Sequence, residues 1–102
     1  MNIKELLSRY GAGQRDFRNL NLIAANLRSV NLSGVNLRDA DLRGANLTRA
    51  NLSHADLTDA LLAGADLTQT NLTAADLSGV DLSSLDLSQT NLSRAIVTSP
   101  TS

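Results

Sequence analysis

The feature that most constrains this 102-residue chain is a five-residue period that runs through most of its length. Phe17 is followed by a leucine at every fifth position from Leu22 to Leu92, and Val97 completes the series. The residue two positions before each of these is mostly small and apolar. The residue directly before is nearly always Asp or Asn, and the two that follow are polar or small. The repeating unit is therefore A-(D/N)-L-x-x.

A period of five fits neither regular secondary structure. On an α-helix the leucines would move around the axis, and on a flat strand alternate leucines would face opposite sides. All of them can be buried only if the chain turns after each pentapeptide. The leucine and the small residue two before it then point inward together, and the other three point outward. The period predicts a chain that coils around its own core.

A longer repeat indicates how many sides each coil has. The segment LTQTNL at 67–72 returns as LSQTNL at 87–92, twenty residues later. Four pentapeptides per coil would stack positions twenty apart at about 4.8 Å. Under this register Asn31, Asn51, Asn71 and Asn91 form one column, which predicts a ladder of hydrogen bonds between asparagine side chains. A three-sided coil is the alternative, and it would scatter this column.

The first residues predict a short helix. Asn2, followed by Glu5 three residues later, is typical of a capping box, and glycines at 11 and 13 supply a stop. Four apolar residues fall on one face at helical spacing: Ile3, Leu6, Leu7 and Tyr10. We expect this helix to cover the first coil above Phe17 and Leu20, because an open solenoid end exposes its apolar interior.

These units, together with the opening L-L-x-x-Y-x-A-G-x-R-D-F at residues 6–17, resemble the pentapeptide repeat family, and small cyanobacterial members in particular. The resemblance implies an all-β solenoid, a right-handed quadrilateral β-helix of about four coils with a short N-terminal α-helical cap. We expect a capping helix at 1–13, the β-helix at 14–99 and a tail at 100–102. The sequence departs from the pattern at few places: Leu61 and Ile96 replace Asp or Asn, and Thr70 and Thr90 replace the inward small residue.

Composition excludes several classes of function. The chain has no cysteine, one histidine and two aromatic residues. It therefore cannot form a thiolate or multi-histidine metal centre, and it offers no platform for stacking bases. We expect no cofactor. No apolar run approaches the roughly 20 residues that span a bilayer, so we expect no membrane contact and a cytoplasmic location.

Two groups of side chains could suggest chemistry. Ser53, His54 and Asp56 match the residue types of a hydrolytic triad, but the register places Ser53 and His54 on a convex wall without a cleft or an oxyanion hole. Four aspartates form an acidic wall: Asp39, Asp56, Asp59 and Asp76. Such flat columns lack the converging oxygen ligands that calcium prefers. We therefore expect neither catalysis nor a metal site.

The net charge of −1 conceals a gradient, since residues 1–51 carry +4 and residues 52–102 carry −5. Five arginines of the basic half are spread over three walls, so no direct nucleic-acid binding is expected: Arg18, Arg28, Arg38, Arg43 and Arg49. Members of the family that imitate DNA and bind DNA gyrase imply an alternative function. However, duplex DNA over a rod of about 20 Å carries about twelve negative charges, far more than this chain.

The most favoured function is a non-enzymatic scaffold or protein-interaction module with an unidentified protein partner. The wall that contains Leu22, Leu42, Leu62 and Leu82 is the least polar, and Ile23, Leu61 and Ala63 on it are candidate partner-binding residues. The C-terminal end has no second helix to cover it. Ile96 and Val97 are candidates for end-to-end association of two copies.

Overall fold

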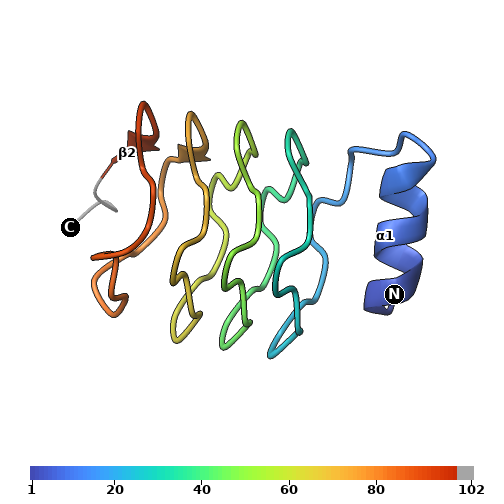
Figure 1. Ribbon diagram of the computed structural model, residues 1–102, viewed down its shortest axis with the longest axis horizontal. Coiled ribbons are helices and arrows are strands. Elements are labelled where there is room, and N and C mark those ends of the chain that lie inside the picture. The colour runs from blue at the N-terminus through green and yellow to red at the C-terminus, as the bar shows by residue number, and fades with distance from the viewer. Residues whose placement is uncertain (99–102) are drawn as a thin grey trace.

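The computed structural model describes residues 1–98 (Figure 1). It contains the helix α1 (Ile3–Gly11) and the short strands β1 (Asp76–Leu77) and β2 (Ile96–Val97). Successive coils stack side by side along the long axis, and α1 lies across the N-terminal end (Figure 1). The molecule measures 37 × 24 × 24 Å. The expected tail at 100–102, and Ser99 before it, lie outside the described residues.

Each coil contains four pentapeptides. Parallel bridges join residues twenty apart, for example Asp16 with Asn36 and Asn31 with Asn51, and β1 pairs with β2 at the same offset. The expected twenty-residue register is confirmed. The alternative of a three-sided coil, which would have a fifteen-residue register, is wrong. Regular strand is nevertheless scarce, because the chain turns after every five residues and each wall offers only one or two residues to the ladder. The solenoid is built mainly from isolated bridges and turns.

The corners are turns with a left-handed residue. In the second repeat, the Ala25 N–H donates to the Leu22 carbonyl (3.1 Å) and Ala24 has φ 55°. A positive φ at the third residue of a four-residue turn is the signature of type II. Residues such as Asp39 and Arg49 adopt it as well as glycine. In this conformation the turn amide points toward the next coil, where the Ala24 N–H meets the Arg43 carbonyl at 2.9 Å.

The Asp or Asn before each leucine holds the turn that follows it. Its Oδ1 accepts the backbone N–H two residues later at 2.9–3.2 Å in every such repeat. The predicted ladder between asparagine side chains is therefore wrong: in the described part of the chain Asn31, Asn51, Asn71 and Asn91 bond within their own turns. Asp and Asn are interchangeable here because both supply the same acceptor oxygen.

The inward leucines form a dry axis. Phe17 and the leucines at every fifth position from Leu22 to Leu77 are at most 3% exposed. The predicted inward series ends earlier than the sequence pattern, however. In the last coil Leu82, Leu87 and Leu92 are half-buried, and Val97 is 51% exposed. Burying Val97 would require a further layer of side chains over it, and no described residue supplies one.

The two inward threonines make use of their hydroxyl groups. Thr70 is fully buried and donates to the Leu47 carbonyl at 2.7 Å, and Thr90 donates to the Leu67 carbonyl at 2.9 Å. We expect Thr70→Val to lower the free energy of unfolding by about 1 kcal/mol, because valine keeps the shape and loses one buried hydrogen bond. Urea unfolding measures this. Thr90→Val is the control, with a smaller loss because Thr90 is half-buried. An equal loss at both sites would contradict the explanation.

The helix α1 covers the first coil. Asn2 Oδ1 accepts the Glu5 N–H at 2.7 Å, while the Glu5 carboxylate binds Arg9 (2.7 Å), so only half of the predicted capping box forms. Leu6 is fully buried in the apolar cluster that includes Phe17, with Ile3, Leu7 and Tyr10 packed against it. Tyr10 further donates its hydroxyl to the Ser33 carbonyl at 2.5 Å. The helix is thus joined to the first coil by this hydrogen bond as well as by apolar packing.

Candidate functional site

One wall of the solenoid differs from the other three in its outward residues. We call it the Leu61 wall, formed by residues 21–24, 41–44, 61–64 and 81–84. Ile23 and Leu61 are each 49% exposed on it, and the corners are occupied by Ala24, Gly44 and Gly64. The two aliphatic side chains lie two coils apart, with the exposed side chain of Arg43 in the coil between them.

Leu61 interrupts the pattern that holds the turns. At the equivalent place in neighbouring coils, Asp41 and Asp81 accept the N–H groups of Arg43 and Ser83. Leu61 has no side-chain oxygen, so it cannot hold the Ala63 N–H in this way. Half of its side chain is exposed, which limits the apolar burial that could offset the loss. The choice of leucine here is therefore not explained by the stability of the fold.

Charge on the Leu61 wall is partly neutralised. The guanidinium of Arg43 binds the carboxylate of Asp41 through two hydrogen bonds of 2.6 and 2.9 Å. These bonds are the main reason that the pKa of Asp41 lies below its usual value. Further along, hydrogen bonds from the Ser83 hydroxyl and N–H lower the pKa of Asp81. Asp81 has no basic partner among the described residues, so it contributes a free negative charge.

A hollow of about 240 Å³ opens on this wall between the third and fourth coils. Its lining includes Leu61, Leu62 and Ala63 on one side and Asp81 and Ser84 on the other. Arg43, Asp59, Ala60 and Gly79 complete it. The sequence predicted Leu61 and Ala63 as contact residues and placed Asp81 and Ser84 on the same wall, but it missed that Asp59 and Gly79 reach the hollow from the neighbouring wall. The twenty-residue register, which places Asp59 beside Gly79, was the signal available.

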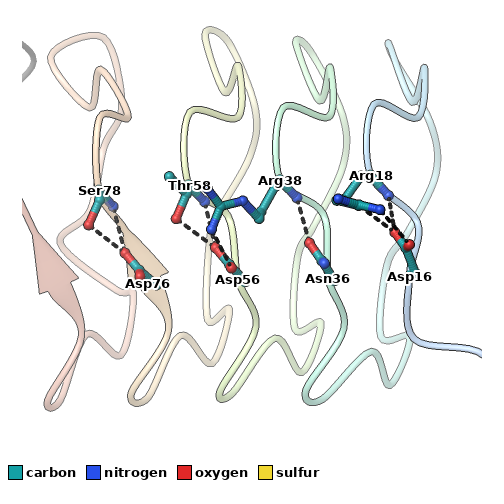
Figure 2. Close-up of polar contacts among 8 residues, drawn as sticks. All are labelled: Asp16, Arg18, Asn36, Arg38, Asp56, Thr58, Asp76 and Ser78. Carbon is teal, nitrogen blue, oxygen red and sulfur yellow. Dashed lines mark hydrogen bonds and ion pairs between the residues drawn. The ribbon is translucent and has the colours of Figure 1, made fainter.

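A neighbouring wall carries the most charged column (Figure 2). Arg18 binds Asp16 within one turn, and Arg38 reaches Asp56 of the next coil at 3.3 Å. Burial alone would raise the pKa of Asp56, but hydrogen bonds from the Thr58 hydroxyl and N–H, and from Arg38, together lower it. The two arginines lie in the first two coils, whereas Asp76 in the fourth bonds Ser78 and has no basic partner among the described residues, so this column becomes acidic toward the C-terminal end (Figure 2).

The three residues of the apparent triad make separate contacts. The Ser53 hydroxyl donates to Ser33 Oγ (3.3 Å), His54 is exposed at a corner, and Asp56 binds Thr58 and Arg38. Within residues 1–98, no three or more His, Asp or Glu side chains are placed to hold a metal ion. The described chain also has no helix that is both long and apolar enough to cross a bilayer.

The C-terminal end differs from the capped N-terminal end. Ile96 and Val97 of β2 are each 51% exposed, and Leu82, Leu85, Leu87 and Leu92 beside them are only half-buried. Apolar surface therefore lies at this end of the described solenoid.

The family model for pentapeptide repeats matches residues 25–62 and 60–98, with eight copies. The chain belongs to the pentapeptide repeat family. Family membership implies a right-handed quadrilateral β-helix, with which the four walls and twenty-residue register agree. No curated protein matches the chain.

Several solved pentapeptide repeat proteins are similar to this one. A Nostoc member is 42% identical over 92% of this chain and 74% of its own, with a TM-score of 0.48. HetL, involved in the regulation of heterocyst differentiation in Nostoc, is 39% identical (TM-score 0.53); the match covers 93% of this chain and 44% of HetL. A pentapeptide repeat protein from the thylakoid lumen of Arabidopsis thaliana is 24% identical (TM-score 0.60), covering 83% of this chain and 63% of its own.

Proposed function

We propose that this pentapeptide repeat chain is a non-enzymatic interaction module that binds a partner protein through the Leu61 wall. The observation that carries the proposal is the replacement of Asp or Asn by Leu61. This residue gives up a turn-holding acceptor at a place where the fold gains little from an aliphatic side chain. Ile23 and Ala63 extend the same surface, and exposed apolar patches of this kind are typical of contact sites between proteins.

The proposal predicts opposite effects of one substitution on stability and on binding. In Leu61→Asp, the new carboxylate can accept the Ala63 N–H as its neighbours do, so the free energy of unfolding should stay equal or rise by about 0.5 kcal/mol. Capture of the partner by the immobilised protein from lysate of the source cells should fall at least ten-fold. Urea unfolding and quantitative mass spectrometry measure the two quantities.

Leu61→Asn is the matched variant, because it restores the acceptor without adding charge. It should lose the partner as well, since the apolar side chain is missing in both. Ser53→Asp, on a different wall, should retain the partner. A protein captured equally by wild type and both Leu61 variants would show that the Leu61 wall is not the contact surface.

The alternative, a DNA mimic that binds gyrase, has less support. Duplex DNA as long as this molecule, 37 Å, carries about 22 negative charges, whereas the whole chain carries −1. Arginines also interrupt the acidic columns, as Arg38 does beside Asp56. Association of two copies through Ile96 and Val97 stays a prediction, as do the cytoplasmic location and the absence of direct nucleic-acid binding.

A further inference from the structure

The backbone ladder between the third and fourth coils is incomplete. On two walls it continues into the last coil, through the bridge from Asn71 to Asn91 and through β1 and β2. On the other two the bridges stop at Leu61 and Asp66, although Asp81 and Asp86 follow them at the usual spacing. One backbone bond still crosses on the Asp66 wall, from the Gln69 N–H to the Gln89 carbonyl at 2.8 Å, but within residues 1–98 none crosses on the Leu61 wall. Among the described residues, the amides of Leu62 and Gly64 therefore lack the carbonyl partners that Leu42 and Gly44 find at 2.8 and 2.9 Å.

The turns of the last coil differ at the same two walls. The corner residue has a positive φ from Asn19 through Gly79, but Ser84 and Gln89 do not share it. A left-handed conformation costs a residue other than glycine about 1 kcal/mol or more, and a backbone hydrogen bond to an adjacent coil helps to offset that cost. Arg94, also in the last coil, keeps a φ of 58° where the Ala74 N–H bonds the Ser93 carbonyl at 2.8 Å, whereas the Gly64 N–H makes no such bond to Ser83. The bulkier Leu85 also stands where the previous coil has Ala65.

The opening leaves a row of hydrogen-bonding groups beside an apolar floor. The amides of Leu62 and Gly64 and the carbonyl of Ala60 lie along one edge, next to the exposed side chain of Leu61. An unpaired edge of this kind accepts an extended chain. The hollow of about 240 Å³ is smaller than most small-molecule pockets, which span about 300–1,000 Å³. It suits one side chain of a longer segment better than a free metabolite.

The charge at the opening is negative. Asp59 and Asp81 line the hollow, and its one basic residue, Arg43, is already bound to Asp41. A Cβ at Gly79 would collide with the Asp59 carboxylate, so the glycine leaves room for that carboxylate beside the hollow. An extended segment with basic side chains two residues before and two residues after an apolar one, all on the same face, therefore complements this surface.

We propose that the gap between the coils at Leu61 and Asp81 binds an extended segment of a partner protein, with an apolar side chain in the hollow, basic side chains toward Asp59 and Asp81, and backbone bonds to Leu62 and Gly64. The proposal names the kind of segment that the Leu61 wall recognises and so rests on the proposed function. It is tested separately, with a probe of defined sequence.

The probe is a fluorescent nine-residue peptide in which lysine and valine alternate at every second position with serine between them, so that both kinds of side chain share one face of the extended chain. Binding to the full chain is measured by anisotropy. We expect the same peptide with alternate backbone amides methylated to bind about ten-fold more weakly, because it cannot make the backbone bonds. Bound unmethylated peptide should slow amide hydrogen exchange at Leu62 and Gly64. Exchange at Leu42 and Gly44, already bonded in the free protein, should not change.

Two substitutions at equivalent repeat positions separate specific from general charge attraction. Asp81 borders the gap, whereas Asp76 lies where the ladder is complete. Replacement by asparagine keeps the acceptor of the turn at both positions. Asp81→Asn should weaken binding about two- to five-fold, the effect of an exposed ion pair, and Asp76→Asn should leave it unchanged. Equal effects of the two, or equal binding of the methylated peptide, would overturn the inference.

A third variant tests whether the opening itself is needed. Ser84→Gly with Gln89→Gly favours the left-handed corner and so favours closing of the ladder; slower exchange at Leu62 would report closure. A closed variant should lose the peptide while Leu61 remains exposed. If the peptide binds a closed variant normally, the inference fails and the proposed function is untouched. If Leu61→Asp retains the natural partner while the peptide results hold, the proposed function alone is wrong.

Discussion

Replacing Leu57 with aspartate is expected to abolish folding. Leu57 is fully buried, and Leu37 and Leu77 in the adjoining coils are equally inaccessible, so a carboxylate at this position meets only aliphatic carbon. Removing the side chain alone, in Leu57→Ala, should cost about 3–5 kcal/mol. The unpaired carboxylate adds several kcal/mol, and the sum is comparable to the total stability of a typical domain, about 5–15 kcal/mol.

Far-ultraviolet circular dichroism and amide dispersion in NMR spectra measure the outcome for Leu57→Asp, and urea unfolding measures Leu57→Ala. Leu92→Asp is the matched control, because Leu92 occupies the same repeat position but is only half-buried in the last coil. That variant should keep a native spectrum at reduced stability. Native spectra for Leu57→Asp would contradict the inward assignment of the leucine columns.

The second large effect is expected at the N-terminal cap. Leu6→Asp should detach α1 from the first coil, because Leu6 is fully inaccessible within the apolar cluster. We expect a loss of about 3 kcal/mol or more in the free energy of unfolding, from the lost burial and from the charge placed against carbon. The exposed end of the solenoid should then bind a hydrophobic dye and promote association.

Ser8→Asp is the control for this cap, since Ser8 is exposed on the same helix. It introduces the same charge without removing a contact and should unfold like wild type. Dye fluorescence and light scattering follow the exposed surface, and urea unfolding gives the stability. Equal stability of the two variants would show that α1 does not protect the first coil.

Much of the fold could be predicted from the five- and twenty-residue spacings alone. The leucines at every fifth position from Leu22 to Leu77 are all buried as the period requires, because no other arrangement of that spacing hides them all. The predicted ladder of asparagine side chains is wrong for a local reason. The Oδ1 of Asn51 already satisfies the Ser53 N–H, and the free exchange of Asp for Asn along the chain was the sign that only an acceptor is needed.

The candidate site could be predicted only in part. The exposed positions of Ile23 and Leu61 follow from the register, but the opening at Asp81 does not. Ser29 adopts a left-handed corner and Ser84 does not, although both are serines at the same repeat position. The difference depends on what stacks against each coil, which is a property of the assembled solenoid and not of the residue. For the same reason Val97 fits the period and is nevertheless exposed.

The twenty-residue register gives insertions an unusual effect on this molecule. Duplicating one pentapeptide would keep the inward columns filled, since every unit presents the same leucine. It would also turn everything beyond the duplication by a quarter of a revolution and move each distal surface residue to the adjacent side. Only additions of four units would lengthen the rod without scrambling its exterior. Surface patches that span several coils can therefore be rearranged between relatives by small duplications that the interior tolerates.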